Sequence, residues 1–420
     1  IAKCRLGRFN GLTEVSRRSV IFCCHCPKSH SRAISLLLLI VSTHLSSKAS
    51  ERKSSMVSAF SLYYLTTALL MLTRSAQSLS PNKLNPIMKT SVLSTTSTTT
   101  TTALKASNSA DLAEGATDLY LRTPLIYSQP ISTLVGKPVY CKMDALQASG
   151  SFKDRGMAQL CASFAKEGVT KVISSSGGNA GLAVTTVGAK LGMEVSVIVP
   201  ETTKAVVIAK LESLGADVTI HGKNWNQADT LARELVEKTP GTKYVSPYDD
   251  PLLWTGHSTM IDEIVEDLPG KVGAVVVSVG GGGLLSGVLE GCKRHSISPK
   301  VIAAETKGAS SFGQAWQAGE TVTLPGIDTI ATSLGATSVT PLVLERAKEH
   351  SGAFCSSICS DQEAVDACLQ FSQDHRMLVE PANGAALAVA YSERLREEYL
   401  KDVVDGPIVL EVCGGSGVNL

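Results

Sequence analysis

The stretch GAVVVSVGGGGLLSG, residues 273–287, decides the fold of this chain. Its first half is almost wholly apolar, which is typical of a strand that is buried on both faces of a parallel sheet. Four consecutive glycines follow, and the apolar pattern over residues 284–295 predicts a helix behind them. A strand, a glycine turn and a helix in this order expose several backbone N–H groups at one point. The stretch therefore predicts a phosphate seat in an α/β protein.

A dinucleotide-binding fold or a purely structural turn could also account for these glycines. The dinucleotide fingerprint requires G-x-G-x-x-G in the first βα turn and an acidic residue about 20 positions later. The spacing after Gly280 and Gly282 meets this pattern poorly, and the motif lies deep in the chain. The phosphate seat is favoured over both alternatives.

Short apolar runs alternate with helical patterns on both sides of this stretch. This alternation predicts an α/β fold built on parallel sheets. We expect two open, twisted parallel-sheet domains with flanking helices. The small domain would be formed by residues 148–250, and the large domain by residues 118–147 and 251–420. Strands are expected at 139–142, 171–175, 195–200, 217–220, 301–305 and 407–415, and helices at 154–166, 179–191, 204–214, 225–237, 284–295, 361–374 and 385–399.

The composition limits the possible partners and leaves the compartment open. The 420 residues carry a net charge of +1, which gives no electrostatic case for binding nucleic acid. Residues 1–117 are expected to be a targeting-like or disordered extension. They include an apolar run that begins at Met56, similar to a secretory signal, and a Ser/Thr-rich stretch before Asp111. The localisation is therefore uncertain, and an organelle is possible.

Three further motifs carry chemistry. SGSFKDRG (149–156) places Lys153 at the start of a predicted helix and near Arg155, both of which would favour a neutral, nucleophilic amine. SSSGGNAG (174–181) follows a strand and opens a helix, and its N–H groups and polar side chains suit a carboxylate or a phenolate oxygen. EVCGGSG (411–417) places Cys413 at the carboxyl end of a buried strand, where ligands bind in open α/β sheets. A surface lysine, an ordinary βα turn and a buried packing cysteine are the structural alternatives.

Together these motifs resemble the fold-type II pyridoxal-phosphate enzymes, with a fold like that of the tryptophan synthase β chain. The likeness is strongest to the serine/threonine dehydratase family. It covers residues 123–420 and also includes ETKGASS (305–311) and EPANGAA (380–386), in the order of that family. The resemblance implies a lyase that removes water from L-serine and L-threonine, which yields pyruvate or 2-oxobutyrate and ammonia. It also implies a homodimer with small-molecule substrates, located in the cytoplasm.

The resemblance also implies a role for each of a set of residues. Lys153 would bond the cofactor covalently and act as the base, Phe152 and Ala331 would cover the two faces of its ring, and Asn179 would bond its 3'-oxygen. The phosphate would be held by the backbone of Gly280, Gly281, Gly282, Gly283 and Leu284, and the pyridine nitrogen would face Cys413. Ser176, Asn179 and Ala180 would receive the substrate carboxylate. A monovalent cation, with K⁺ expected, would be held by Glu305 and by the carbonyls of Ala309 and Ser311.

Three rival functions remain. A serine racemase and a threonine deaminase would use the same cofactor on the same fold. A pseudoenzyme that binds the cofactor without turnover is the alternative that is not an enzyme.

Overall fold

The computed structural model describes residues 110–417 and shows an alternation of strands and helices. The apolar run at Met56 and the Ser/Thr-rich stretch lie outside these residues. The strands are β1 (Leu125–Tyr127), β2 (Val139–Lys142), β3 (Lys171–Ser174), β4 (Glu194–Val199), β5 (Asp217–Ile220), β6 (Thr242–Val245), β7 (Ala274–Ser278), β8 (Lys300–Thr306), β9 (Phe354–Cys359) and β10 (Ile408–Glu411).

The helices follow the strands in the expected alternation. They are α3 (Gln129–Val135), α4 (Lys153–Lys166), α5 (Asn179–Leu191), α6 (Ala205–Ser213), α7 (Trp225–Lys238), α8 (Pro251–Asp267), α9 (Gly283–Arg294), α10 (Ser311–Ala318), α11 (Pro341–Glu349), α12 (Asp361–His375), α13 (Pro381–Tyr391) and α14 (Glu393–Tyr399). Short 3-10 turns are η2 (Ala116–Asp118), η3 (Asp144–Leu146), η4 (Lys307–Ala309) and η5 (Thr332–Leu334).

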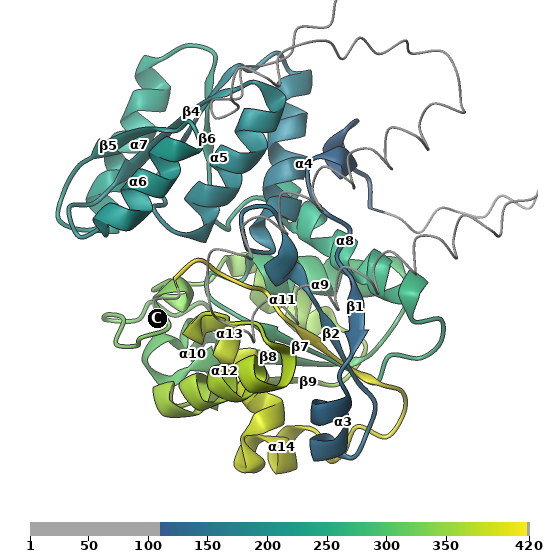
Figure 1. The fold of residues 1–420 in the computed structure, drawn as a ribbon. Coiled ribbons are helices and arrows are strands. Elements are labelled where there is room, and N and C mark those ends of the chain that lie inside the picture. Colours follow the sequence, from purple (N-terminus) through teal and green to yellow (C-terminus); the bar gives the residue numbers. More distant parts are fainter. Residues whose placement is uncertain (1–109, 418–420) are drawn as a thin grey trace, which may run out of the picture. The chain divides into compact units, whose positions relative to one another are not determined.

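Two open sheets organise these elements (Figure 1). The larger sheet has six strands in the order β1-β2-β10-β7-β8-β9, and the smaller sheet has four in the order β5-β4-β3-β6. All neighbouring strands run parallel except β1, which is antiparallel to β2. The expected parallel α/β fold is confirmed, with one short antiparallel strand at an edge. The four strands of the smaller sheet all come from residues 171–245.

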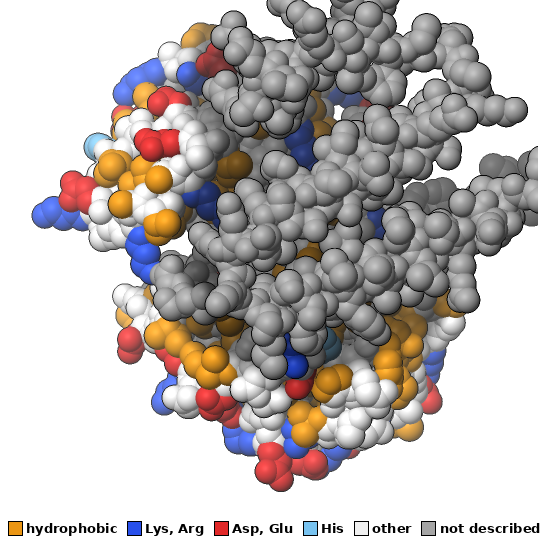
Figure 2. Space-filling model, viewed as in Figure 1, with side chains coloured by type: hydrophobic (Ala, Val, Ile, Leu, Met, Phe, Trp, Pro, Cys, Tyr) orange, Lys and Arg blue, Asp and Glu red, His pale blue; other side chains and the backbone are white. Residues whose placement is uncertain are grey.

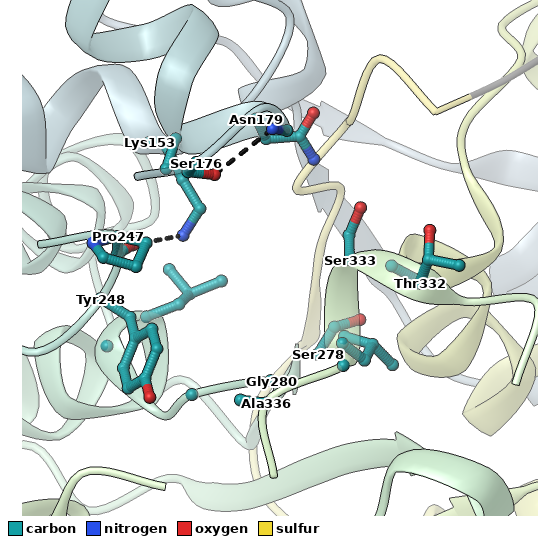
Figure 3. A pocket seen from close by; sticks show the side chains of 18 of the residues that line it. Lys153, Ser176, Asn179, Pro247, Tyr248, Ser278, Gly280, Thr332, Ser333 and Ala336 are labelled. Atoms are coloured by element: carbon teal, nitrogen blue, oxygen red, sulfur yellow. Dashed lines mark hydrogen bonds between the residues drawn. The ribbon is translucent and has the colours of Figure 1, made fainter. Parts of the chain in front are cut away.

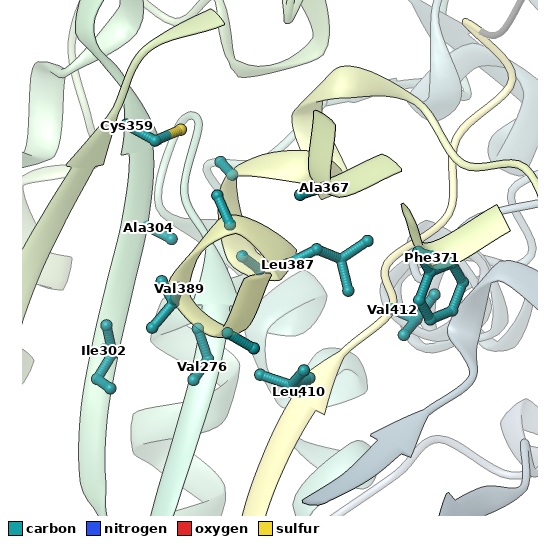
Figure 4. Close-up of a cluster of buried hydrophobic side chains, with 14 of the residues drawn as sticks. Val276, Ile302, Ala304, Cys359, Ala367, Phe371, Leu387, Val389, Leu410 and Val412 are labelled. Atoms are coloured by element: carbon teal, nitrogen blue, oxygen red, sulfur yellow. The ribbon is translucent and has the colours of Figure 1, made fainter. Parts of the chain in front are cut away.

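Helix α13 packs on the larger sheet and forms much of its core (Figure 4). Leu387 and Val389 of this helix lie against apolar side chains of the sheet, among them Ile302 and Leu410. The helix is built largely from alanine, and small side chains let its backbone approach the sheet closely. The packing fixes the start of α13, at Glu380 and Pro381, near the carboxyl ends of the strands.

The structure differs from the expected elements in one helix and adds several. A single helix was expected over 385–399, but the chain breaks at Ser392, whose backbone is extended (φ −72, ψ 123). Helical periodicity continues through the break, so the pattern alone gives no sign of it. The long helix α8 and the strands β6 and β9 were not expected.

Three glycines bring α4, α8 and α9 into close contact. A side chain on Gly256 would place its Cβ 2.3 Å from the carbonyl oxygen of Arg155, which no arrangement permits. A Cβ on Gly156 would lie 2.4 Å from the His257 ring, and one on Gly287 2.6 Å from the His257 Cβ. The start of α4, which carries Lys153, is thereby held against α8.

A cluster of charged side chains is buried beneath the start of α4. The Arg155 guanidinium donates to both oxygens of Asp144, at 2.7 and 2.8 Å, and to both oxygens of Glu263, at 2.6 and 2.8 Å. Lys142 donates to Glu263 at 2.6 Å. All four residues are almost fully enclosed, so these ions depend on one another for the interactions that water would otherwise provide.

Residues 110–117, which were assigned to the extension, lie against the fold. Ala116 is fully buried beside α4, and the Ala113 N–H donates to the Gln159 side chain at 2.7 Å. On the visible part of the described surface, acidic and basic side chains are intermingled (Figure 2). In the described part of the chain, no helix is both long enough and apolar enough to cross a membrane.

Candidate active site

A cavity of about 610 Å³ opens where the strands of both sheets end. Its walls come from the segments that follow β3, β6, β7 and β10, which all meet at the carboxyl edges of parallel strands. Ligands bind at such edges in open α/β folds. The cavity lies in the described part of the chain and brings together residues that are far apart in the sequence.

Lys153 is the first residue of α4, and its amine opens on this cavity (Figure 3). The Nζ donates to the carbonyl oxygen of Pro247 at 3.0 Å and lies 4.7 Å from the centre of the Phe152 ring. Burial lowers the pKa of the Lys153 amine to about 8, against the opposing influence of Cys413 and Glu380. Near pH 7 about a tenth of the amine is therefore unprotonated, far more than for an ordinary lysine, and this is the form that acts as a nucleophile.

The expectation that Arg155 helps to lower this pKa is not supported. The guanidinium is neutralised by Asp144 and Glu263, and burial is the cause that lowers the Lys153 pKa. The sequence placed the two cations close together but could not show that one was already paired.

Four glycines form the floor of the cavity where β7 meets α9. A Cβ on Gly281 would lie 2.3 Å from the Tyr248 ring, and one on Gly283 would lie 2.7 Å from the Tyr248 carbonyl oxygen. Gly282 has φ +89, a conformation that L side chains rarely adopt. Only glycine fits these positions, and the first backbone N–H groups of α9 have no acceptor within the helix. This geometry binds phosphate.

The turn after β3 forms a second polar wall. Ser176, Asn179 and Ala180 all line the cavity. Gly181 must be glycine, because a Cβ there would lie 1.8 Å from the Ser176 carbonyl oxygen. This close contact bends the turn so that the first N–H groups of α5 are available for an anion such as a carboxylate.

Asn179 is held at three points. Its Nδ2 donates to Glu380 at 2.8 Å, while its Oδ1 accepts from the Ser416 N–H at 2.9 Å and from the Ser416 hydroxyl at 3.0 Å. These contacts fix which face of the amide is turned outward. One N–H of the amide remains to donate to a ligand.

Cys413 lies two residues after β10 and lines the cavity. Burial raises the pKa of its thiol well above the ordinary value, so the sulfur stays protonated and uncharged. Its carbonyl oxygen accepts from the Phe152 N–H at 3.1 Å, which ties the thiol to the segment that carries Lys153.

Ala331 does not line the cavity. It is buried in the core of the larger sheet, next to η5, and Ser333, two residues later, lines the cavity instead (Figure 3). The segment between α10 and α11 contains only the short turn η5, so no periodicity indicates which of its residues faces inward.

Glu305, Ala309 and Ser311 lie together outside the cavity. The Glu305 carboxylate is buried and accepts from the N–H groups of Phe312 and Gly313 at 2.8 and 2.7 Å. Burial raises the pKa of this carboxyl to about 8. Among the described residues no group of three or more His, Cys, Asp or Glu side chains could hold a metal ion.

The sequence did not indicate three residues that line the cavity. They are Tyr248, whose ring covers the glycine turn, Pro247, whose carbonyl receives the lysine amine, and Glu380, which holds Asn179. EPANGAA belongs to the quoted motifs, but nothing in its pattern shows that its glutamate reaches a helix about 200 residues earlier in the chain.

Comparison with known proteins places this site in a family. A model of the family described as pyridoxal-phosphate dependent enzyme matches residues 116–414. A mouse protein named L-serine dehydratase/L-threonine deaminase is 43% identical over 306 residues, which cover 72% of this chain and 93% of that protein.

Solved structures agree with this match. The L-serine ammonia-lyase of the fungus Rhizomucor miehei has a TM-score of 0.67 and 33% identity, covering 72% of this chain and 96% of the other. Maize serine racemase has a TM-score of 0.67 and 26% identity, covering 74% and 94%.

The described cavity fits a cofactor of this kind, since it combines a reactive lysine amine with a glycine turn suited to phosphate and a wall suited to a carboxylate. The chain belongs to the pyridoxal-phosphate-dependent enzymes, in the branch that contains the L-serine dehydratases.

Proposed function

We propose that this chain is an L-serine and L-threonine dehydratase, a lyase that removes water from a β-hydroxy amino acid. The observation that carries the proposal is the Lys153 amine, whose pKa burial lowers and which opens on one cavity together with the glycine turn and the 176–180 wall. The similarity to the mouse and fungal enzymes supports the same reaction.

The family resemblance gives each of these residues a role, and their places in the cavity are compatible with it. The amine of Lys153 would bond the cofactor covalently and give way to the substrate amine. The backbone N–H groups of Gly280–Gly283 and Leu284 would hold the phosphate, Phe152 would cover a face of the ring, and Cys413 would face the pyridine nitrogen. Bound pyridoxal phosphate takes up the electron pair that is left on the α-carbon when its proton is removed.

The proton transfers are assigned to this chain. The released Lys153 amine takes the α-proton, while Ser176, Asn179 and Ala180 hold the substrate carboxylate in place. The β-carbon–oxygen bond breaks, and the hydroxyl departs as water with the proton that Lys153 has taken up, which leaves the amine unprotonated again. The enamine that is released then takes up water, so that serine gives pyruvate and ammonia and threonine gives 2-oxobutyrate and ammonia.

Measurement of 2-oxo acid and ammonia released from L-serine and L-threonine tests this proposal. Equal amounts of the two products are expected from each substrate. Conversion of L-serine to D-serine with little 2-oxo acid would instead support a racemase, the second candidate, which the fold shared with maize serine racemase favours.

A monovalent cation site, with K⁺ as the expected ion, is proposed at Glu305 and at the carbonyl oxygens of Ala309 and Ser311. The buried Glu305 carboxylate has two backbone donors and a raised pKa, so a bound cation would offset the cost of its charge. Activity should be higher in K⁺ than in Na⁺ or Li⁺, and Glu305→Ala should remove this dependence. Equal rates of the parent in all three salts would contradict the site.

A homodimer is proposed as the assembly. The edge strand β1 leaves Ile126 and Tyr127 40% and 46% exposed, and such apolar edges are commonly covered by a partner. Light scattering of the purified chain should give twice the monomer mass, and a monomer at micromolar concentration would contradict the proposal.

A further inference from the structure

The turn that would hold the substrate carboxylate is supported from behind by one aspartate. β3 ends at Ser174, and residues 175–178 lead without regular structure to α5. Among the side chains of 174–178, the hydrogen bonds that reach another element are made by Ser175. Its hydroxyl donates to Asp229 Oδ1 at 2.7 Å and lies 2.9 Å from the Tyr244 hydroxyl.

The Asp229 carboxylate accepts hydrogen bonds from three donors, which lie on three different elements. Besides the Ser175 hydroxyl, its carboxylate accepts from the Tyr244 hydroxyl on β6 and from Arg233 Nε, one turn later on α7, at 2.8 Å. Its side chain is 14% exposed. Burial opposes the charge, but the hydrogen bonds from Tyr244, Arg233 and Ser175 together lower the pKa of this carboxyl. It is therefore an ionised acceptor at neutral pH, and hydrogen bonds to a charged acceptor are the stronger kind.

The Arg233 guanidinium lies on the solvent-exposed side of Asp229 and Tyr244. It lies 4.1 Å from the centre of the Tyr244 ring, so it stacks on the phenol that bonds the same carboxylate. The cluster of Ser175, Asp229, Arg233 and Tyr244 thus joins the turn after β3, helix α7 and strand β6.

The position of the cluster relative to the cavity suggests its use. Ser176 and Gly177 line the cavity, as do Asn224, Trp225 and Asn226 at the start of α7, whereas Asp229 does not. The carboxylate of Asp229 thus belongs to α7 and contacts the turn after β3, and it does not itself line the cavity. Two glycines follow Ser176, so the backbone of this turn has little stiffness of its own.

We propose that Asp229 is a positioning residue for substrate binding, which acts through Ser175 to hold the Ser176–Ala180 turn in the conformation that receives the carboxylate of the amino acid. The proposal rests on the role given above to that turn. Lys153 and the Gly280–Gly283 turn lie on other segments, and Asn179, to which the resemblance also gives a contact with the cofactor, is held separately by Glu380 and Ser416. The attachment of the cofactor should therefore not depend on Asp229.

The test compares Asp229→Asn and Ser175→Ala with the parent enzyme loaded with cofactor. Each variant is expected to raise KM for L-serine roughly tenfold, the effect of losing one hydrogen bond to a charged group, with a smaller change in kcat. The near-visible absorbance of the loaded enzyme and its Kd for the cofactor should stay unchanged. The double variant should raise KM little more than either single change, because Ser175→Ala removes the Ser175–Asp229 hydrogen bond and Asp229→Asn takes the charge from the acceptor of that same bond.

Glu234→Gln is the matched control. This acid is the exposed neighbour of Arg233 on α7, paired with Lys238, and its loss should leave KM and kcat unchanged. A KM for Asp229→Asn equal to that of the parent, or additive effects in the double variant, would overturn the inference.

Ser176→Ala separates this inference from the proposed function. It is expected to raise KM as well. If Ser176→Ala leaves KM unchanged, the turn does not bind the carboxylate and the assignment of the site fails. If Ser176→Ala raises KM while Asp229→Asn lowers only the melting temperature, the site stands and Asp229 is merely structural, which overturns the inference alone.

Discussion

Lys153 and Arg155 stand two residues apart at the start of α4, the first half-buried at the cavity and the second fully buried, and their pKa values are shifted in opposite directions. Lys153 has a neutral carbonyl as its hydrogen-bond partner, and burial lowers its pKa to about 8. Arg155 has two carboxylates, and although burial opposes it, their charges and hydrogen bonds raise its pKa well above the ordinary value. The difference shows that burial alone does not decide whether a basic side chain keeps its positive charge. The hydrogen-bond and ion-pair partners of the side chain decide this as well.

The two environments also serve different ends. The ion pairs of Arg155 hold α4 against η3 and α8, since Asp144 and Glu263 lie on those elements. The amine next to it can then lose its proton without the helix losing its anchor. A reactive lysine and a permanent cation share one helical turn because each has its own set of partners.

The largest effect is expected for a change of Lys153, on catalytic activity. Lys153→Ala should reduce dehydration of L-serine by roughly a thousandfold or more and remove the near-visible absorbance of the bound cofactor, because no other amine takes its place. Reduction of the loaded parent with borohydride, followed by peptide mapping, should find the cofactor on Lys153. A cofactor mapped to a different lysine would contradict the assignment.

Removal of a carboxylate partner of Arg155 should instead lower the free energy of unfolding. Glu263→Gln leaves Arg155 with one carboxylate and Lys142 with none, and breaking a buried ion cluster in this way costs about 3–5 kcal/mol. Urea denaturation of the parent and the variant measures this loss.

Arg122→Met is the control for that loss. Arg122 also contacts two carboxylates, Glu266 and Asp267, but its side chain is 50% exposed. Its loss should cost no more than about 1 kcal/mol. Similar losses for the buried and the exposed change would refute the role given to burial.

The pH dependence of cofactor uptake tests the lowered pKa of Lys153 directly. The lysine amine reacts only when it is unprotonated, so the rate at which the cofactor-free chain takes up pyridoxal phosphate should rise about tenfold per pH unit below 8 and level off above it. Stopped-flow absorbance measures the rate. A profile that keeps rising to pH 10 would show that the amine has the pKa of an ordinary lysine.

The smallest effect is expected at Glu411, a third charge-bearing group beside the same cluster. Both of its carboxylate oxygens are buried without a hydrogen-bond partner among the described residues, and burial raises its pKa well above the ordinary value. The stability that its protonated form contributes is complete below the pKa of the unfolded chain and is lost as the pH rises toward the folded-state pKa.

Glu411→Gln should therefore leave stability nearly unchanged at pH 4 and raise the melting temperature by roughly 2–4 °C at pH 8. Calorimetry at the two pH values measures the difference. A variant that loses stability at pH 8 would show that the ionised carboxylate has a partner in the folded protein.

The sequence predicted the parts of the site that lie within continuous motifs. The Gly280–Gly283 turn and the Ser176–Ala180 turn follow the carboxyl ends of β7 and β3, which belong to different sheets, and they line one cavity together with Lys153 at the start of α4. Cys413 was located by the same argument. These predictions needed no knowledge of contacts between residues that lie far apart in the sequence.

What the sequence missed depends on tertiary packing. Tyr248 reaches the glycine turn because β6 and α8 place it there, and Glu380 reaches Asn179 because α13 packs on the larger sheet. Ala331 was expected on the cofactor and lies in the core, since the segment around η5 has no regular period to indicate its inward face. At Ser392 the failure has the opposite origin, since the helical pattern is unbroken there although the backbone is extended.

The position of β10 has a consequence for how the protein folds during its synthesis. This strand pairs with β2 on one side and β7 on the other, so the middle of the larger sheet is made from residues 408–411, while β2 is made from 139–142. During translation the ribosome must deliver nearly the whole catalytic region before the gap between β2 and β7 can be filled. Until then two strands present unpaired edges, a state that invites association with other chains and recruits chaperones. Completion of the sheet and arrival of Cys413 at the cavity are a single late event, so a nascent chain cannot become active before its larger sheet is whole.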